Sequence, residues 1–448
     1  MTDRTMPLPT LEQMTEHWQA LAQRIPARQA TVGVVGLGYV GLPLAMAFAG
    51  GGFPVIGLDV NVEKIDRLRQ GHSDVLDIPS AAVSDALQAG TFQPSTQMAA
   101  LTAADAIIIC VPTPTHRNRQ PDLSYIERAA VSIAQVLRPG QLVILESTTY
   151  PGTTEEMLVP LLGASGLRPN TDFLVAFSPE RIDPGNRTFQ VTNTPKVVGG
   201  LGAMAGDLAC ALYGAVIDTV VRVDSPREAE MAKLIENTFR HVNIALANEL
   251  AIIARRMGVD IWQAIAAAAS KPFGFMPFYP GPGVGGHCIP IDPHYLSWKA
   301  REMGCDISFI ELATRINQGM PDYVVQLVTD ALNAHGLSVR GTRILVLGLS
   351  YKRDIDDIRE SPSLEILDKL QQRGADVSYH DPYIPRFTRG DLHLTSRELS
   401  PEVLQSMQCV VMVTDHSSYN LEQIRIHAPL IIDTRNVFGR TDEHIIRL

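Results

Sequence analysis

The 448-residue chain is predicted to fold as an α/β protein with two doubly wound domains, joined by a long central helix and a helical middle domain. Short, nearly continuous apolar runs alternate with helical stretches in both the first and the last part of the chain. Such runs are typical of strands in a parallel sheet that is covered on both faces. Between these parts, the chain continues after Pro226 for more than thirty residues without glycine or proline, which predicts its longest helix.

These patterns divide the chain into four segments. Residues 1–30 form an N-terminal extension with one amphipathic helix around residues 11–22. Residues 31–223 hold apolar strands at 31–36, 54–60, 106–115, 141–148 and 173–181, and residues 326–448 hold strands at 343–351, 376–380, 409–414 and 429–434. The middle segment, residues 224–325, holds the long helix, more helix through Ala269, a loop dense in glycine and proline, and a helix around 309–333.

The composition argues against several classes of function. The formal net charge is −10, whereas nucleic-acid-binding proteins usually carry a basic excess, so no nucleic-acid partner is expected. The five cysteines include no CxxC pair, so neither a disulfide scaffold nor a metal site is expected. The chain has no run of about 18 apolar residues that would span a membrane, and residues 1–30 lack the apolar core of a signal peptide. We therefore expect a cytoplasmic protein without membrane contact.

A glycine turn between the first strand and the first helix predicts a dinucleotide site. Its residues are Gly36, Leu37, Gly38, Tyr39, Val40 and Gly41, which fit the pattern GxGxxG. The first glycine permits the tight turn, the second lets the backbone approach a pyrophosphate, and the third lets helix and strand pack closely. The helix N-terminus would bind the phosphates. The alternative is a glycine turn in an α/β protein that binds no nucleotide.

Asp59 follows the second strand, at the spacing expected for an acid that binds the adenosine ribose. Its carboxylate can accept hydrogen bonds from both ribose hydroxyls and would repel a 2′-phosphate, which favours NAD over NADP.

Polar residues follow three other strands of the first domain. Strand ends of such sheets face the bound ligand. The residues concerned are Pro112, Thr113 and Thr115, then Ser147, Thr148 and Thr149, and finally Glu180. The residues alone leave two interpretations open, because Thr and Ser also form turns and Glu180 could be a surface acid.

Cys288 lies in the most unusual stretch, where glycines precede a cysteine and a helix is expected to follow. A thiol at a helix N-terminus has a lowered pKa and reacts more readily as a nucleophile. Asp292 follows one helical turn later and would disfavour the thiolate unless a cation balances it. From the residues alone, the cysteine is either a nucleophile or a structural thiol.

Lys233 and Asn237 lie four residues apart on the long helix and therefore share a face. An amine and an amide that project together could stabilise a developing oxyanion. The alternative is a solvated helix surface.

Together these stretches resemble the nucleotide-sugar dehydrogenases, the family of UDP-glucose and GDP-mannose dehydrogenases. The similar motifs are, in chain order, GLGYVGLP, ESTTYPGT, SPER, KLIENTFRHVNIALANE, GVGGHCIPIDP and GLSYKRDIDDIRESPS. The resemblance covers the chain from about Thr31 to the C-terminus. It implies an NAD-binding Rossmann-like domain, a helical dimerisation core and a Rossmann-like UDP-binding domain.

The resemblance also implies a reaction and residue roles. Two NAD molecules would oxidise the C6 alcohol of a UDP-sugar to a carboxylate, with Cys288 as the nucleophile that forms a thiohemiacetal and then a thioester. The implied catalytic residues are Cys288, Lys233, Asn237, Asp292, Glu180 and Thr149. The implied cofactor contacts are Gly36, Gly38, Tyr39, Val40, Gly41, Asp59, Pro112, Thr113, Thr115, Thr149 and Arg359. The implied substrate contacts are Glu180, Arg181, Lys233, Asn237, Tyr279, Gly285 and Lys352.

Two positions depart from the UDP-glucose enzymes of this family. Pro184 stands where an acidic residue is usual, and Ile291 stands where a lysine is common. The resemblance is closer to the branch that acts on UDP-N-acetylhexosamines. We therefore expect a UDP-N-acetyl-D-glucosamine 6-dehydrogenase for surface polysaccharide synthesis, with UDP-N-acetyl-D-mannosamine and UDP-glucose as alternative substrates.

The same residues bear on two alternative functions and on the assembly. A two-electron dehydrogenase of the β-hydroxyacid type would need neither the cysteine nor the last domain. A non-catalytic sensor of nucleotide sugars would need no complete catalytic set, yet Cys288, Lys233, Asn237 and Asp292 are all present. The long helix has more apolar positions than one narrow stripe requires, so a homodimer through this helix is expected.

Overall fold

A computed structural model describes residues 16–75, 77–116, 120–183, 185–186, 188–389 and 392–448. The chain divides into two units, residues 1–236 and residues 237–448. Helix α1, Glu16–Arg24, covers the second half of the helix expected around residues 11–22, and its Trp18 and Leu21 are buried in the first core. The remainder of that expected helix lies outside the described residues. Among the described residues, no helix is long and apolar enough to cross a membrane.

Unit 1 is built on an eight-stranded sheet in the order β3-β2-β1-β4-β5-β6-β7-β8. Its neighbouring strands pair in parallel except β6 and β7, which pair antiparallel. The strands are β1 Val32–Val35, β2 Val55–Leu58, β3 Phe92–Ser95, β4 Ala106–Ile109, β5 Gln141–Leu145, β6 Phe173–Phe177, β7 Lys196–Gly200 and β8 Val220–Val223. The expected strands are present, and β3, β7 and β8 are additional. These three lack a long apolar run, because they contain Pro94, two glycines or charged residues.

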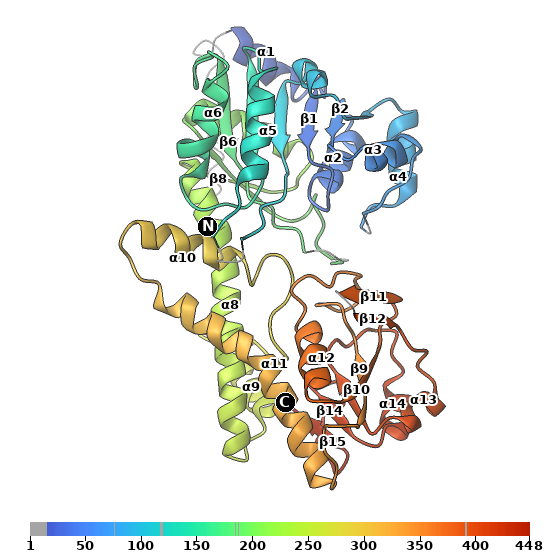
Figure 1. The fold of residues 1–448 in the computed structure, drawn as a ribbon. Helices are drawn as coiled ribbons and strands as arrows, with labels where there is room; N and C mark the ends of the chain where they lie inside the picture. Colours follow the sequence, from blue (N-terminus) through green and yellow to red (C-terminus); the bar gives the residue numbers. More distant parts are fainter. Residues whose placement is uncertain (1–15, 76, 117–119, 184, 187, 390–391) are drawn as a thin grey trace. The chain divides into compact units, whose positions relative to one another are not determined.

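Helices cover both faces of this sheet, as the predicted doubly wound fold requires (Figure 1). Alternate residues of each central strand enter two separate apolar cores; Ile108 and Ile144 belong to one, and Ile107 and Val143 to the other. The apolar runs are continuous for this reason. The helices of unit 1 are α2 Gly41–Gly50, α3 Val62–Arg69, α4 Ser80–Gln88, α5 Ser124–Ala134, α6 Val159–Gly163 and α7 Ala203–Gly214, with the short helices η2 Met98–Ala103 and η3 Thr154–Leu158.

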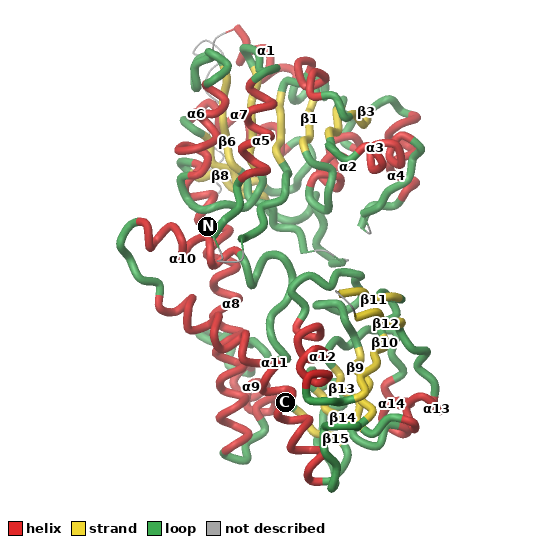
Figure 2. Tube along the Cα trace, in the orientation of Figure 1, coloured by secondary structure: helices red, strands yellow, loops and turns green. Residues whose placement is uncertain are grey.

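Helix α8, Pro226–Arg256, is the predicted long helix; it begins in unit 1 and continues into unit 2. Three more helices follow: α9 Ile261–Ala269, α10 Asp292–Glu302 and α11 Ser308–Ala334. Figure 2 shows this helical part of the chain in red. Helix α11 matches the helix expected around residues 309–333.

The last part of the chain forms a five-stranded parallel sheet in the order β10-β9-β13-β14-β15. The strands are β9 Arg343–Leu347, β10 Asp376–His380, β13 Cys409–Met412, β14 Ile431–Asp433 and β15 Ile445–Arg447, covered by α12 Pro362–Gln372, α13 Pro401–Ser406 and α14 Leu421–His427. The four expected strands are present. Strand β15 and the hairpin of β11 Arg386–Arg389 and β12 Leu392–Thr395 are additional, because strands of three or four residues give too short a pattern to be predicted.

In both sheets the order of the strands changes direction at one point. Ligands of open α/β sheets bind at this point, outside the carboxyl ends of the strands. In the first sheet this point lies between β1 and β4, and in the second it lies between β9 and β13. The glycine turn follows β1, and the segment with Lys352 follows β9. The topology thus gives each unit its own candidate ligand edge.

Candidate active site

The glycine turn after β1 has the geometry that a dinucleotide site requires. Gly36 has φ +92°, and a Cβ there would lie 2.6 Å from the carbonyl oxygen of Cys110. A Cβ on Gly41 would lie 1.8 Å from the carbonyl oxygen of Gly36. At Gly38, by contrast, a Cβ would meet no described atom within 4 Å. Two glycines are therefore required by the fold, whereas the third leaves space over the turn for a phosphate group.

Asp59, directly after β2, closes this turn. One carboxylate oxygen accepts a hydrogen bond from Leu37 N at 3.0 Å, and the other accepts from Asn61 N at 2.9 Å. Because the side chain is only partly buried and each oxygen can accept a second bond, the carboxylate can also bind ribose hydroxyls. The residues of this edge therefore fit NAD.

The neighbouring strand ends complete the edge of the first sheet. Thr113 is buried after β4, Pro112 is exposed, and Thr115 forms a bridge with Pro121. The Ser147 hydroxyl donates to the carbonyl oxygen of Val111 at 2.8 Å. The other residues of the turn itself are half-buried Val40 and Tyr39, whose side chain is exposed.

Thr149 is completely buried, and its Oγ1 has no hydrogen-bond partner within the described part of the chain. A buried hydroxyl without a partner is costly unless a ligand or water binds it. This supports a ligand-binding role for Thr149.

Glu180 and Lys233 are brought together within unit 1. The Lys233 ammonium donates to the backbone carbonyl oxygen of Glu180 at 2.5 Å. One oxygen of the Glu180 carboxylate accepts from the backbone N of Arg181 at 2.6 Å, and the Arg181 guanidinium pairs with Glu236 of α8 at 2.6 Å. Helix α8 therefore fixes the turn that carries Glu180.

A buried ion cluster supports this turn, and the sequence did not predict it. Lys196, at the start of β7, lies 2.9 Å from one carboxylate oxygen of Glu146 and 3.5 Å from one of Glu180. The other Glu146 oxygen accepts from the Tyr213 hydroxyl. Burial raises the pKa of Glu146 to about 7, although Lys196 opposes this rise. Burial lowers the pKa of Lys196, but its two carboxylate neighbours raise it above the usual value.

Glu230 is a second buried acid that the sequence did not reveal. It lies on α8 and accepts from Gly152 N at 2.6 Å, from Thr154 N at 2.9 Å and from the Thr154 hydroxyl at 2.7 Å. Burial raises its pKa to about 7, while these donors oppose the rise. Its position one helical turn before Lys233 is the one sequence feature that could have pointed to it, because both residues then lie on the same face of α8.

In unit 2, the expected thiol lies in the turn that starts α10. The carbonyl oxygen of Cys288 accepts from Asp292 N at 2.8 Å, and the residue is half-buried. Asp292 is 2% exposed and accepts from the Asn237 amide of α8 at 2.6 Å. The structure thus brings Cys288, Asp292 and Asn237 together. Asn237 contacts Asp292 within unit 2, whereas Lys233 contacts Glu180 within unit 1.

The loop before Cys288 packs on the segment that follows β9. A Cβ on Gly285 would lie 2.6 Å from the Cβ of Tyr351, and Gly286, with φ +90°, donates to the carbonyl oxygen of Arg359 at 3.0 Å. Gly281 N donates to Asn248 of α8 at 2.9 Å. The glycines of this loop are therefore required for close packing. Tyr279 stacks on Trp262 with ring centroids 5.7 Å apart and remains 51% exposed.

The segment with Lys352 is fixed by a buried pair, Asp381 and His416, which the sequence also did not reveal. One Asp381 oxygen accepts from Leu349 N at 2.7 Å, from Ser350 N at 3.0 Å and from His416 Nε2 at 3.1 Å. Although burial opposes it, these bonds lower the pKa of Asp381 to about 2. Arg359, the expected cofactor contact, pairs with Asp357 at 2.6 Å in this same unit.

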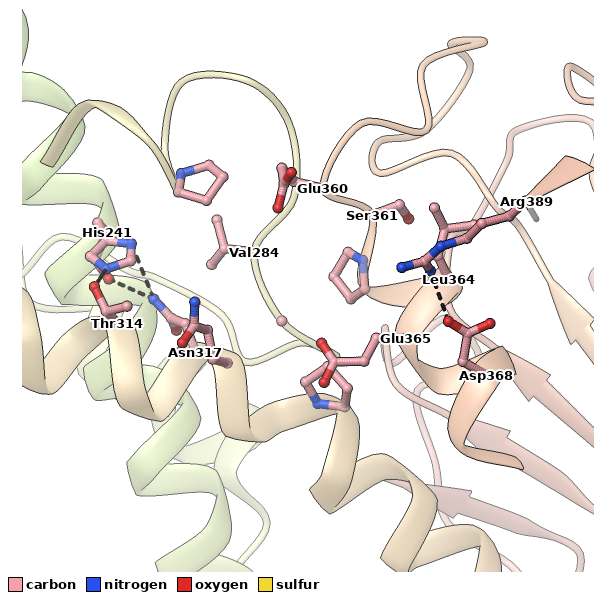
Figure 3. Close-up of a pocket in the computed structure, with 15 residues that line it drawn as sticks. His241, Val284, Thr314, Asn317, Glu360, Ser361, Leu364, Glu365, Asp368 and Arg389 are labelled. Carbon is pink, nitrogen blue, oxygen red and sulfur yellow. Dashed lines mark hydrogen bonds and ion pairs between the residues drawn. The ribbon is translucent and has the colours of Figure 1, made fainter. Parts of the chain in front are cut away.

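A pocket of about 320 Å³ lies beside the cysteine loop (Figure 3). On one side of the pocket, the His241 ring forms a hydrogen bond with Thr314 at 3.1 Å, and Asn317 donates to the His241 carbonyl oxygen at 3.1 Å. The ion pair of Arg389 and Asp368 lies on the other side. Gly283, Val284 and Pro290 of the cysteine loop also line it. Neither Cys288 nor Lys352 is among the described residues that line this pocket.

Among the described residues, no group of three His, Cys, Asp or Glu side chains could hold a metal ion. Unit 1 supplies a dinucleotide turn, an unpaired hydroxyl and a supported carboxylate. Unit 2 supplies a thiol with an adjacent Asp–Asn pair and, at a sheet edge, the segment that carries Lys352.

Comparison with known proteins identifies the family. The models of the UDP-glucose/GDP-mannose dehydrogenase family match residues 30–217 as the NAD binding domain, 227–319 as the central domain and 345–440 as the UDP binding domain. The chain is 38% identical to a UDP-N-acetyl-D-mannosamine dehydrogenase from Pyrococcus horikoshii over 91% of this chain and 95% of that protein. It is 42% identical to a UDP-N-acetyl-D-glucosamine 6-dehydrogenase from Pseudomonas aeruginosa over 79% of this chain and 83% of that protein.

A solved structure supports the same assignment. The structure of UDP-D-ManNAc dehydrogenase from Pyrococcus horikoshii matches with a TM-score of 0.84 and 36% identity, over 93% of this chain and 98% of that one. The expected fold class and NAD cofactor are thereby confirmed. The chain belongs to the UDP-glucose/GDP-mannose dehydrogenase family and is an NAD-dependent nucleotide-sugar dehydrogenase.

Proposed function

We propose that the protein oxidises the C6 hydroxymethyl group of a UDP-N-acetylhexosamine, with UDP-N-acetyl-D-glucosamine favoured, to the uronic acid for surface polysaccharide synthesis. The observation that carries this proposal is the turn that bears Cys288. Its carbonyl oxygen accepts from Asp292, whose carboxylate binds Asn237, and its loop packs on the segment with Lys352. A thiol held beside an acid and a nucleotide-binding segment suits covalent capture of a sugar aldehyde.

The residues of unit 1 would hold the cofactor. Gly36, Gly38 and Gly41 would accept the pyrophosphate, and Asp59 would bind the adenosine ribose. Bound NAD would accept one hydride in each of the two oxidations. Thr149 would use its unpaired hydroxyl to bind cofactor or substrate.

Cys288 would turn the first product into a second hydride donor. Its sulfur forms a C–S bond with the aldehyde carbon, and the thiol proton ends on the aldehyde oxygen, which gives a thiohemiacetal. Loss of a hydride from that carbon and a proton from that oxygen gives a thioester. Water then breaks the C–S bond, which releases the carboxylate and regenerates the thiol. One alcohol and one water thus yield one carboxylate, two reduced cofactors and three protons.

The other predicted residues would handle charge and protons. Lys233 and Asn237 would stabilise negative charge on the reacting oxygen. Asp292 and Glu180 would orient water and accept protons. Tyr279, Gly285, Lys352 and Arg181 would contact the nucleotide sugar, and Arg359 would contact the cofactor.

Two substitutions and the relatives support an N-acetylated sugar. Ile291 lies where UDP-glucose enzymes often carry lysine, and Pro184, outside the described residues, replaces a usual acid. Both relatives described above are named for UDP-N-acetylhexosamines. UDP-N-acetyl-D-mannosamine and UDP-glucose remain the alternative substrates.

We also propose that the chain forms a homodimer through α8. Phe239, Leu246, Leu250 and Ile253 of this helix are each more than 40% exposed and recur at helical spacing. Light scattering should give about twice the 48.9 kDa of one chain.

NADH production should be measured with UDP-GlcNAc, UDP-ManNAc, UDP-GalNAc, UDP-glucose and GDP-mannose. We expect two NADH per UDP-GlcNAc consumed. One NADH per sugar would instead support a two-electron dehydrogenase, and turnover of UDP-glucose alone would refute the substrate assignment.

The Cys288→Ser variant should lose net oxidation and retain binding of the nucleotide sugar, because the serine hydroxyl is a much weaker nucleophile than the cysteine thiol. Calorimetry measures the binding, and Cys305→Ser, at an exposed cysteine, is the matched control. An active Cys288→Ser enzyme would contradict the covalent mechanism.

A further inference from the structure

Lys196 reaches the ligand edge of the first sheet because β7 runs against its neighbour. The register pairs Ala176 with Gly200 and Phe177 with Gly199. Continued by the bond from the Ser178 hydroxyl to the carbonyl oxygen of Val197, this pairing brings the first residue of β7 opposite Glu180. In a fully parallel sheet, the first residue of a strand lies at the edge opposite to the ligand.

The side chain of Lys196 is only 5% exposed and lies between two carboxylates. Its ammonium is 2.9 Å from Glu146, which is 1% exposed, and 3.5 Å from Glu180. Burying a charge costs free energy unless the charge is paired, and packing alone does not require three charged groups in the core. No step of the reaction proposed above uses Glu146 or Lys196.

We propose that Lys196 is a positioning residue, which holds the Glu180 carboxylate in its reactive orientation and is itself anchored by Glu146. The inference rests on the proposed function, in which Glu180 handles a proton. Backbone N–H groups fix one Glu180 oxygen, and Lys196 contacts the other, so the two together define the rotation of the carboxylate. The Tyr213 hydroxyl fixes Glu146 in the same way.

All the titratable groups that face Lys196 are buried. The groups that face Lys196 are Glu146 after β5, Glu180 after β6, Tyr213 of α7, whose ring centroid lies 5.2 Å from the ammonium, and Cys110 after β4. If these groups are ionised as two carboxylates and one ammonium, with the thiol and phenol neutral, the cluster carries one net negative charge. Burial raises the pKa values of both Cys110 and Tyr213, so these two remain neutral.

The test compares three variants. Lys196→Met removes the cation, Lys196→Arg keeps a cation, and the double variant Glu146→Gln/Lys196→Met keeps the net charge of the cluster while Glu180 loses its partner. The double variant is included because Lys196→Met alone leaves two buried carboxylates without a cation and could fail to fold. Arg168→Met, which breaks an exposed ion pair with Asp172, is the control for a lost surface cation.

We expect the double variant to lose about 100-fold in kcat, as for a catalytic group displaced by about 1 Å, with KM for UDP-sugar and NAD nearly unchanged. Lys196→Arg should recover about tenfold of that loss, because it restores a cation at the same position. Equal loss in Lys196→Arg and the double variant, or a rise in KM without a fall in kcat, would overturn the inference.

Crystal structures of the wild type and the double variant decide the same point without turnover. The Glu180 carboxylate should rotate or shift in the variant, and an unchanged carboxylate would overturn the inference. If the wild type oxidises no UDP-sugar, the proposed function fails, while the position of Glu180 still tests the role of Lys196.

Discussion

The two sheets place an aspartate at the same topological position and use it in opposite ways. Asp59 follows β2 and accepts a hydrogen bond from Leu37 N, in the turn after the neighbouring strand β1. Asp381 follows β10 and accepts from Leu349 N and Ser350 N, in the turn after the neighbouring strand β9. Both turns begin at a glycine with positive φ, Gly36 at +92° and Gly348 at +86°. The two units therefore share one solution for closing the turn at the ligand edge.

The difference lies in what else each carboxylate binds. Asp381 is 1% exposed and is also bonded to His416 and to the backbone N–H groups of Tyr383 and Ile384. Asp59 is partly exposed and, within the described part of the chain, accepts hydrogen bonds from the backbone N–H groups of Leu37 and Asn61. A saturated, buried carboxylate stabilises the fold, whereas one with free acceptor capacity at the surface can bind a ligand.

The largest effect that separates the two is expected for Asp381→Asn. The asparagine amide would oppose the backbone N–H groups that now donate to the carboxylate, and His416 would lose its partner. We expect the free energy of unfolding to fall by about 3–5 kcal/mol, as for other broken buried pairs. Urea denaturation measures the change.

The control for this variant is Asp376→Asn, at the exposed start of the same strand, which should change stability by less than about 0.5 kcal/mol. Equal effects of the two substitutions would refute a structural role for the buried pair.

The contributions of Asp381 in unit 2 and Glu230 in unit 1 to stability should depend on pH with opposite signs. The pKa of Asp381 is about 2 in the folded protein, below its unfolded value of about 3.9. Asp381 therefore contributes about 2.5 kcal/mol of stability above pH 4, which is lost as the pH falls toward 2. The pKa of Glu230 is about 7, above its unfolded value of about 4.3, so its contribution is fully present below pH 4 and is lost as the pH rises through 7.

Thermal unfolding from pH 3 to 8 should therefore show that Glu230→Gln reduces the slope of the profile between pH 5 and 8, to which Glu146 also contributes, and that Asp381→Asn reduces the slope below pH 4. If both variants keep the profile of the wild type, the opposed signs are wrong.

Asp59→Asn is expected to have the smallest effect on stability but a clear effect on NAD binding. The loss of one charged hydrogen-bond acceptor should weaken NAD binding about tenfold, with little change in unfolding, because solvent replaces the lost contacts. Calorimetry with NAD measures this, and Glu63→Gln, in the first turn of α3, is the control. A large loss of stability in Asp59→Asn would abolish the contrast with Asp381.

The sequence predicted those parts of this comparison that depend on local spacing. Asp59 was found because it stands at a fixed distance from the glycine turn, and α8 was found from its uninterrupted helical pattern. The sequence predicted Asn237 and Asp292 separately as site residues. Their contact is visible only in the structure, because the two residues lie on different helices and are 55 positions apart. Their catalytic roles, like those of Cys288 and Lys233, stay predictions.

Long-range pairs between polar residues could not be found in this way. Asp381 and His416 are 35 positions apart, and neither belongs to a periodic pattern. Lys196 was missed because β7 is a short strand with two glycines, and its role depends on the reversed direction of that strand. Glu146 belongs to the motif ESTTYPGT, but only the fold shows that this acid, which follows a fully buried strand, lies beside a cation.

The reversed strand also has a consequence for how the segment before it can vary in length. The segment between Glu180 and Lys196 leaves and re-enters the sheet at the same edge, and its ends are joined by the Glu180–Lys196 contact and by the bond from Arg181 to the carbonyl oxygen of Pro195 at 2.6 Å. A loop whose ends are fixed tolerates insertions and deletions at small cost. Changes in the length of this segment should therefore leave the Glu180 carboxylate in place, so that the loop can vary while the group proposed to handle a proton keeps its position.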